Sequence, residues 1–375
     1  MSIEAGSIDA APIKAGSAEA ASTGAQAADK ALAGSPVGQL SDNDLQQILR
    51  IATGGTLAFF LCKLLDLPYG AFFCVYPMLL LGLVPRLNAH LIRQFLAQGL
   101  VVSLEVGVLQ GLFGARPALM IPLVFLLFLY RFALMARGPL FLFGALGSVF
   151  LSIQLNFASY AYTDVIEMLG YNGLAIALSA AIAGLMFYLF PDRTPRPARA
   201  APTKDRASLR HEALLGATVA TLSFTVFQCL DLHDSLSAQV ASILLLFPMH
   251  WKGSSFAGRI RAVGTLLGCA LALLMMLALH THYDVLPLVT PMFWVAALCC
   301  ARWHMLENGL PGVGFGALTT LAILFGQSLT PSHDILYATL YRLSSVCVAV
   351  LLTLFAVFIV HRLLNRFEAT RHSSH

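Results

Sequence analysis

Twelve apolar segments follow one another along this chain, and they constrain its fold more than any other feature. A helix needs ~20 mostly apolar residues to cross the apolar core of a bilayer, and several of these segments are somewhat shorter. With 58% hydrophobic and only 11% charged residues, the composition differs from that of soluble domains, in which roughly 25% of residues are charged. We therefore predict an all-α integral membrane protein with about 12 transmembrane helices. The segments cover residues 49–65, 69–84, 94–113, 117–132, 139–158, 170–190, 213–229, 235–250, 262–280, 285–301, 309–328 and 336–360.

The second half of the chain repeats the pattern of the first half at an offset of 165 residues. An ordered series of matches at one offset is typical of a tandem duplication. Because six segments fall in each half, both halves enter the membrane in the same direction, so we predict two parallel six-helix repeats, 45–190 and 212–367. The matches include Leu65-Asp66-Leu67 with Leu230-Asp231-Leu232, Gly99 with Gly264, and, seven residues late, Phe143-Gly144-Ala145-Leu146 with Phe315-Gly316-Ala317-Leu318.

The basic residues are distributed unequally between the two sets of alternate connections. Most Lys and Arg residues fall in one set, together with the linker and the C-terminal tail, and we assign Arg131 and Arg261 to this basic set. The opposite connections hold mainly Asp and Glu, with Arg116 as their only basic residue. The positive-inside rule places the basic set, and with it both termini, in the cytoplasm.

Three segments outside the two repeats complete the predicted organisation. Residues 1–44 are rich in Ala, Gly and Ser and lack the basic and apolar regions of a signal peptide, which predicts a disordered cytoplasmic tail. Residues 191–211 form a basic, proline-containing linker, either plainly solvated or in contact with anionic lipid. Residues 368–375 form a short C-terminal tail.

Glu105 is the only acidic residue inside a predicted span, and its counterpart in the second half is Ala270. A charged side chain at the membrane centre costs ~2.5–3.5 kcal/mol on insertion scales, so it normally faces a cavity or a partner. Glu105 is therefore a candidate for proton coupling, with Lys63 at similar depth as a candidate partner. Two plainer interpretations stay open: Glu105 is a structural carboxylate, and Lys63 extends outward to the membrane surface.

Polar side chains in the spans give four candidates for substrate binding. Arg342 lies near the start of the last span beside Tyr341, where a guanidinium can bind a carboxylate and stack on an aromatic ring. The alternative is that Arg342 anchors the end of its helix at the interface. Gln98 and Gln154 are polar groups at membrane depth that bind either substrate or a neighbouring helix.

No motif for catalysis, metal or cofactor binding is present in the sequence. The seven cysteines fall in apolar runs without zinc-site spacing, and the histidines form no ligand set. P-loop, nucleophile-elbow and nucleotide motifs are also lacking. We expect no cofactor, no metal site, no nucleic-acid partner and no enzymatic activity.

Short motifs in both halves resemble the fusaric acid resistance and aromatic acid exporter superfamily. Residues 50–113 match best, with the turn Leu67-Pro68-Tyr69-Gly70 followed by a loop containing Arg86 and Arg93. Residues 216–280 are similar to a weaker copy, with Arg259, Arg261 and Gly264-Thr265-Leu266-Leu267-Gly268, but with His233 where the turn proline is expected. Larger members resemble two such halves separated by sizeable cytoplasmic domains, whereas this chain has only a short linker.

The resemblance implies a bacterial inner-membrane efflux transporter for aromatic or other small organic acids, with proton-driven export as our interpretation of Glu105. It also implies a periplasmic adaptor protein as a partner, and we add a homo-oligomer as a further expected assembly. Two alternatives stay open: a passive organic-anion channel, and a non-transporting membrane scaffold for an adaptor complex. A scaffold has no need of a carboxylate at membrane depth, which favours transport.

Overall fold

The computed structural model of the chain describes most of the two predicted repeats. The greater part of the predicted N-terminal tail, residues 195–204 of the linker, His233 and residues 372–375 lie outside the described residues. The described residues are 40–160, 163–194, 205–230, 232, 235–279, 282, 285–307, 309, 311–328 and 335–371.

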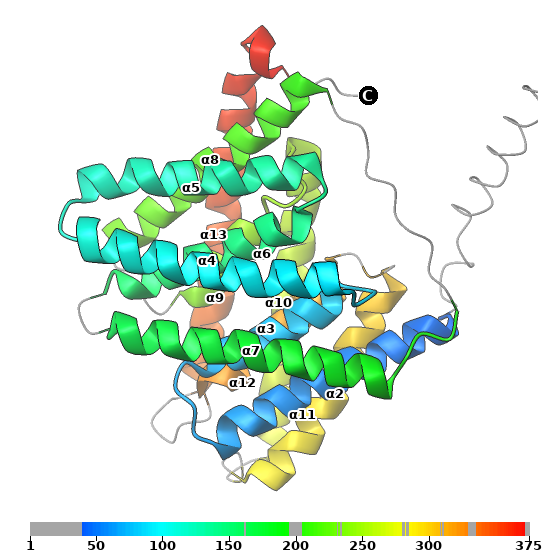
Figure 1. Cartoon of the computed structure of the whole chain (residues 1–375). Helices are drawn as coiled ribbons and strands as arrows, with labels where there is room; N and C mark the ends of the chain where they lie inside the picture. Colours follow the sequence, from blue (N-terminus) through cyan, green and yellow to red (C-terminus); the bar gives the residue numbers. More distant parts are fainter. Residues whose placement is uncertain are drawn as a thin grey trace, which may run out of the picture. The chain divides into compact units, whose positions relative to one another are not determined.

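Within these residues all regular structure is helical, which confirms the predicted all-α class (Figure 1). Each helix coincides with one of the predicted apolar segments, and most extend it at one or both ends. The α-helices are α2 (Asp42–Leu64), α3 (Gly70–Leu83), α4 (Ala89–Phe113), α5 (Pro117–Arg137), α6 (Phe141–Ala158), α7 (Val165–Leu189), α8 (Arg206–Cys229), α9 (Leu236–Leu244), α10 (Trp251–Leu279), α11 (Leu286–Leu306), α12 (Val313–Ser328) and α13 (Ile335–Leu364).

Nine of the described helices are long and apolar enough to cross a membrane, and α3, α9 and α12 are shorter. At 1.5 Å per residue, the 14 residues of α3 span only ~21 Å of a ~30 Å apolar core. The expected segment 235–250 contains only the nine residues of α9, because the chain turns after Leu244, passes through Pro248 and reaches Met249 with a positive φ of 56°. The twelve described α-helices agree with the predicted number, and these three are the short ones among them.

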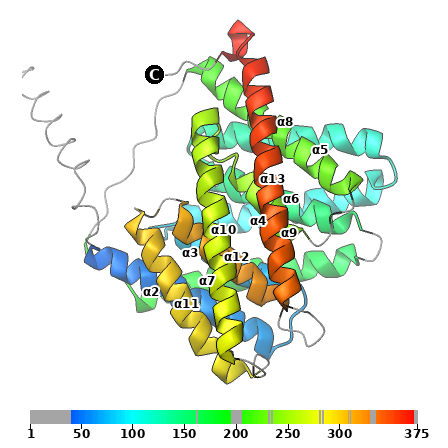
Figure 2. The ribbon, with the colours of Figure 1, turned by 180° about the vertical axis from the view of Figure 1, so that it is seen from behind.

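The helices pack in a pattern that repeats between the two halves. Across the halves, α2 packs on α11 and α3 on α12, and correspondingly α8 packs on α5 and α9 on α6. Within the halves, α4 contacts α6 and α7, and correspondingly α10 contacts α12 and α13 (Figures 1 and 2). Moving six helices along the chain thus converts each of these pairs into another observed pair, which is the arrangement a duplication would produce.

Contacts between neighbouring helices fix their relative directions. For example, α10 and α13 are antiparallel, because Trp251 at the start of α10 lies against Phe358 near the end of α13, with ring centroids 5.1 Å apart. The starts of α2, α8, α10 and α12 therefore lie on the same side as the ends of α7, α11 and α13. We call this side, on which α7 ends and α8 begins, the linker side.

Glycines allow some of these helices to approach one another closely. A Cβ built on Gly264 of α10 would lie 2.7 Å from the carbonyl oxygen of Val313, and one on Gly268 would lie 2.7 Å from that of Ala317. No larger residue fits either position without moving α10 away from α12. Small residues at helix contacts are the usual basis of close packing in membranes.

The apolar surface divides the helices into an inner and an outer group. The inner helix α3 is buried from Ala71 to Gly82, whereas the outer helices leave large apolar side chains exposed. Leu100 on α4 is 74% exposed, and Leu277 on α10 is 76% exposed. Exposed apolar side chains on this scale are what acyl chains would cover in a bilayer. The all-α membrane class predicted from the sequence thus holds for the structure.

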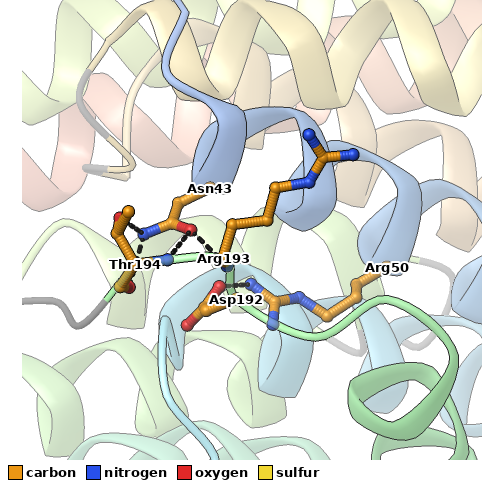
Figure 3. Close-up of polar contacts among 5 residues, drawn as sticks. All are labelled: Asn43, Arg50, Asp192, Arg193 and Thr194. Atoms are coloured by element: carbon orange, nitrogen blue, oxygen red, sulfur yellow. Dashed lines mark hydrogen bonds and ion pairs between the residues drawn. The ribbon is translucent and has the colours of Figure 1, made fainter.

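Polar contacts join the start of α2 to the end of α7 at the linker side (Figure 3). Arg50 donates to Asp192 at 2.8 Å, although its side chain is almost completely buried. Asn43 donates to the carbonyl of Thr194 at 2.9 Å and accepts from the backbone N–H of Arg193 at 2.8 Å. In the second half, His211 of α8 contacts His361 of α13 at 2.9 Å in the corresponding place. In both halves, polar contacts thus join the first and the last helix of the half on the linker side.

Candidate anion-binding site

A cavity of about 410 Å³ opens where α9 ends and where α10 and α12 begin, on the linker side. Its walls are mainly apolar and aromatic, since Phe247, Phe256 and Phe315 line it together with Pro248. Two charged residues, Arg261 and Glu307, also line it. A mostly apolar cavity with a few polar groups is the usual form of a small-molecule site.

Arg261 is the group in this cavity that most requires a partner. Its side chain is only 6% exposed, and its Nη1 donates to Thr319 Oγ1 at 2.8 Å. Its Nε is buried and has no hydrogen-bond partner, and no ion pair involves Arg261 within the described residues. A buried cation without a counter-ion costs several kcal/mol, so an anion in the cavity would stabilise this arrangement.

Glu307 is committed to a different role at the edge of the cavity. Its carboxylate accepts from the backbone N–H groups of Val313 at 2.9 Å and Gly314 at 3.0 Å. These groups begin α12, and a carboxylate there also interacts favourably with the positive end of the helix dipole. Glu307 therefore fixes the start of α12 and leaves Arg261 without a bonded carboxylate.

The arrangement can bind a small aromatic anion. A guanidinium recognises a carboxylate through two parallel hydrogen bonds and stacks on aromatic rings. Phenylalanine side chains supply apolar surface for a ring. The cavity volume lies within the range of small-molecule pockets, roughly 300–1,000 Å³.

The first half contains a buried arginine comparable to Arg261, and a carboxylate of the same half neutralises its charge. Arg131 of α5 is fully buried and forms an ion pair with Glu105 of α4. A Cβ built on Gly147 of α6 would lie 2.8 Å from Arg131 Nε, so this glycine leaves room for the guanidinium. Gly147 and Thr319 follow the repeated Phe-Gly-Ala-Leu motif at the same distance. The two arginines thus lie against matching positions of α6 and α12, and among the described residues only Arg131 has a carboxylate partner.

The structure does not bring the two proton-coupling candidates Glu105 and Lys63 together, because the Glu105 carboxylate pairs with Arg131. Lys63 Nζ instead donates to the carbonyl oxygen of Gly326 at 3.2 Å, near the end of α12. The main neighbours of α2 are α3, α7 and α11, whereas α4 packs mainly on α6 and α7. Equal depth in the membrane therefore did not imply contact. The assignment of Arg131 and Arg261 to basic connections is corrected as well, since both lie buried within helices.

The four substrate-binding candidates do not form one site. Arg342 of α13 is buried and donates through Nη2 to Gln327 Oε1 at 2.7 Å. The adjacent Tyr341 hydroxyl lies 2.9 Å from Ser235 Oγ. Gln98 of α4 and Gln154 of α6 are fully buried in the other half, and neither lines the Arg261 cavity.

The sequence held one signal for Arg261 that the charge pattern obscured. No proline interrupts the run from Phe256 to Gly264, and the helix indeed continues through Arg261 back to Trp251. An arginine on a continuous helix with a glycine three residues later is placed beside a close helix contact. The predicted span begins at residue 262, which places Arg261 in the preceding loop.

Comparison with known families gives one match for each half. Residues 47–186 match a family described as a protein of unknown function, DUF2955. Residues 220–356 match a family described as fusaric acid resistance protein-like. No curated protein and no solved structure matches the chain.

The helical structure and the long apolar helices define the class of protein: the chain is a multi-pass, all-α membrane protein. Its second half matches the fusaric acid resistance protein-like family over residues 220–356, and its first half matches the DUF2955 family over residues 47–186. The resemblance drawn from the sequence is therefore confirmed, although the named family matches the half in which we had found the weaker copy. The family points to a function related to membrane transport or efflux.

Proposed function

We propose that the protein exports small aromatic or other organic acids across the bacterial inner membrane, and that the Arg261 cavity is its substrate site. The main support is that Arg261 is buried in a cavity with aromatic walls and that its Nε has no hydrogen-bond partner among the described residues. The substrate carboxylate binds Arg261 and its ring contacts Phe256 and Phe315. The charge asymmetry of the sequence supports a cytoplasmic linker side, from which an exporter must load its substrate.

Proton-driven export is part of this proposal, and the Glu105–Arg131 pair supports it. Protonation of Glu105 would remove the charge that Arg131 requires, so uptake of a proton would alter the contact between α4 and α5. Such a pair can respond to a proton gradient without touching substrate. A periplasmic adaptor and a homo-oligomer belong to the same proposal and rest on the family resemblance alone.

Equilibrium binding to the purified protein tests the substrate site. Radiolabelled 4-hydroxybenzoate should bind the wild type, and 4-hydroxybenzamide, which lacks the charge, should not compete. The Arg261→Gln variant should weaken binding at least about tenfold, since a charge-assisted hydrogen bond contributes ~1.5–3 kcal/mol. The matched control is Arg259→Gln, because Arg259 is an exposed arginine of the same helix. Equal affinity of Arg261→Gln and wild type would refute the site.

Flux measurements separate the exporter from a passive channel. In proteoliposomes, the exporter should move 4-hydroxybenzoate against the concentration gradient of the acid only when a proton gradient is applied. A channel would equilibrate the anion and never move it uphill. Failure of both uphill transport and equilibration in protein that binds the acid would support the scaffold alternative instead.

A further inference from the structure

Two buried arginines bind α12 two helical turns apart. Arg261 donates to Thr319, and Arg342 donates to Gln327, which lies eight residues further along the same helix. Eight residues correspond to ~12 Å along a helix axis. The first arginine belongs to α10 and the second to α13, and these helices lie side by side (Figure 2).

Arg342 shares the incomplete bonding of Arg261. It is 6% exposed, its Nη1 is buried without a hydrogen-bond partner, and the described residues provide no ion pair for it. Gln327, its partner through Nη2, is exposed near the end of α12 that lies away from the linker side. Arg342 is therefore a buried cation next to an exposed polar group on the side opposite the cavity entrance.

Each of the two arginines has, about one helical turn away, a buried hydroxyl without a hydrogen-bond partner among the described residues. Thr265 follows Arg261 by one turn on the same face of α10, and its Oγ1 is buried without a hydrogen bond. Cys269, one turn further, donates to the carbonyl of Thr339 at 3.9 Å and so joins this face to α13. Thr339 precedes Arg342 by three residues, and its own hydroxyl is also unpartnered.

We propose that Arg342 is a second anion-binding station, to which the carboxylate of the substrate passes after leaving Arg261. This inference rests on the proposed function. The hydroxyl of Thr265, one turn from Arg261, and that of Thr339, one turn from Arg342, donate hydrogen bonds to the passing carboxylate, and Gln327 receives it where α12 ends. A carboxylate moving along this route stays within reach of a donor throughout, which lowers the cost of crossing an apolar region.

An interfacial anchor is the competing interpretation of Arg342, and the observed burial counts against it. An anchoring arginine extends its guanidinium to water or lipid headgroups and is exposed there. Arg342 instead directs its guanidinium to α12. An anchor also has no need of the buried Thr265 and Thr339 hydroxyls, which have no hydrogen-bond partner among the described residues.

Counterflow exchange in proteoliposomes tests the second station without a coupling ion. Vesicles loaded with unlabelled 4-hydroxybenzoate take up the labelled acid at mildly alkaline pH, where passive leak of the neutral acid is small. We expect Arg342→Gln to lower the exchange rate at least about tenfold while equilibrium binding at the Arg261 cavity stays as in the wild type. Arg362→Gln, at an exposed arginine of α13, is the matched control and should exchange normally.

The outcomes for the two proposals differ. If the Arg342→Gln variant exchanges at the wild-type rate, the second station is overturned and the proposed substrate site is unaffected. The substrate site is tested separately, by the binding affinity of the Arg261→Gln variant. If Arg342→Gln does not fold, Arg342→Lys and the double variant Thr265→Val, Thr339→Val take its place. Arg342→Lys keeps the charge and should exchange faster than any folded neutral variant, and the double Val variant should slow exchange without weakening binding. The neutral variant for this comparison is Arg342→Ala. The station would equally be refuted if the double Val variant exchanged normally and Arg342→Lys exchanged no faster than Arg342→Ala.

Discussion

Arg131 of α5 and Glu105 of α4 form an ion pair in which the guanidinium is completely buried and the carboxylate side chain is 17% exposed. Breaking a buried pair by removing one partner typically costs ~3–5 kcal/mol, because the other charge stays behind. We therefore expect Glu105→Gln to lower the thermal midpoint of the detergent-solubilised protein clearly. The double variant Glu105→Leu, Arg131→Met should recover most of the loss. A midpoint for Glu105→Gln equal to that of the wild type would show that Arg131 does not depend on this carboxylate.

The same pair gives a prediction about coupling. In the double variant Glu105→Gln, Arg131→Gln no charge is left unpaired, so the protein should fold and retain counterflow exchange. Export driven by a proton gradient should be lost, because the carboxylate that takes up the proton is absent. Comparing gradient-driven export with counterflow in the same vesicles checks this. Normal gradient-driven export would assign proton coupling to another group.

The close contact between α10 and α12 predicts opposite effects of one substitution at two glycines. Gly264→Ala places a Cβ 2.7 Å from the Val313 carbonyl oxygen and should destabilise the protein, as the helices must separate. Gly184→Ala in α7 meets nothing within 4 Å and should be neutral or stabilising, by up to ~1 kcal/mol from helix propensity. Thermal unfolding of both variants decides the matter. Equal midpoints would contradict the described contact.

The Glu307 carboxylate predicts a local effect on the cavity. Glu307→Ala removes two hydrogen bonds to the start of α12, at a cost of about 0.5–2 kcal/mol for a lost helix cap. Because Phe315 belongs to the same first turns, 4-hydroxybenzoate affinity should fall as well, although Glu307 carries the wrong charge to bind the acid. A higher affinity in Glu307→Ala would instead mean that the carboxylate repels the substrate.

Membrane orientation can be tested at two positions outside the described residues. In a cysteine-free background, a cysteine at Thr203 in the linker should resist an impermeant thiol reagent in intact spheroplasts. A cysteine at Ser332, between α12 and α13, should react. Labelling at Thr203 alone would reverse the predicted orientation and place the Arg261 cavity outside the cell.

The sequence was sufficient for the helical class and for nearly every helix position, because apolar runs bounded by turns dictate both. It was insufficient for contacts between helices. Glu105 and Lys63 lie at similar depth, but depth does not reveal that the neighbours of α2 are α3, α7 and α11. The charge pattern misplaced Arg261 for a related reason: a basic residue in the first turns of a span reads like one in a loop until its surroundings are known.

The packing of α2 on α11 has a consequence for how the protein is made. The start of α11 follows the end of α2 by about 220 residues, which takes roughly 10–45 s at ~5–20 residues per second of translation. Until then α2 resides in the membrane without one of its main neighbours, and Phe59 lacks the stacked ring of Phe293. The same delay does not apply to α8, whose partner α5 is already present. Substitutions on the α11-facing surface of α2 should therefore affect yield in cells more than they affect the stability of the finished protein.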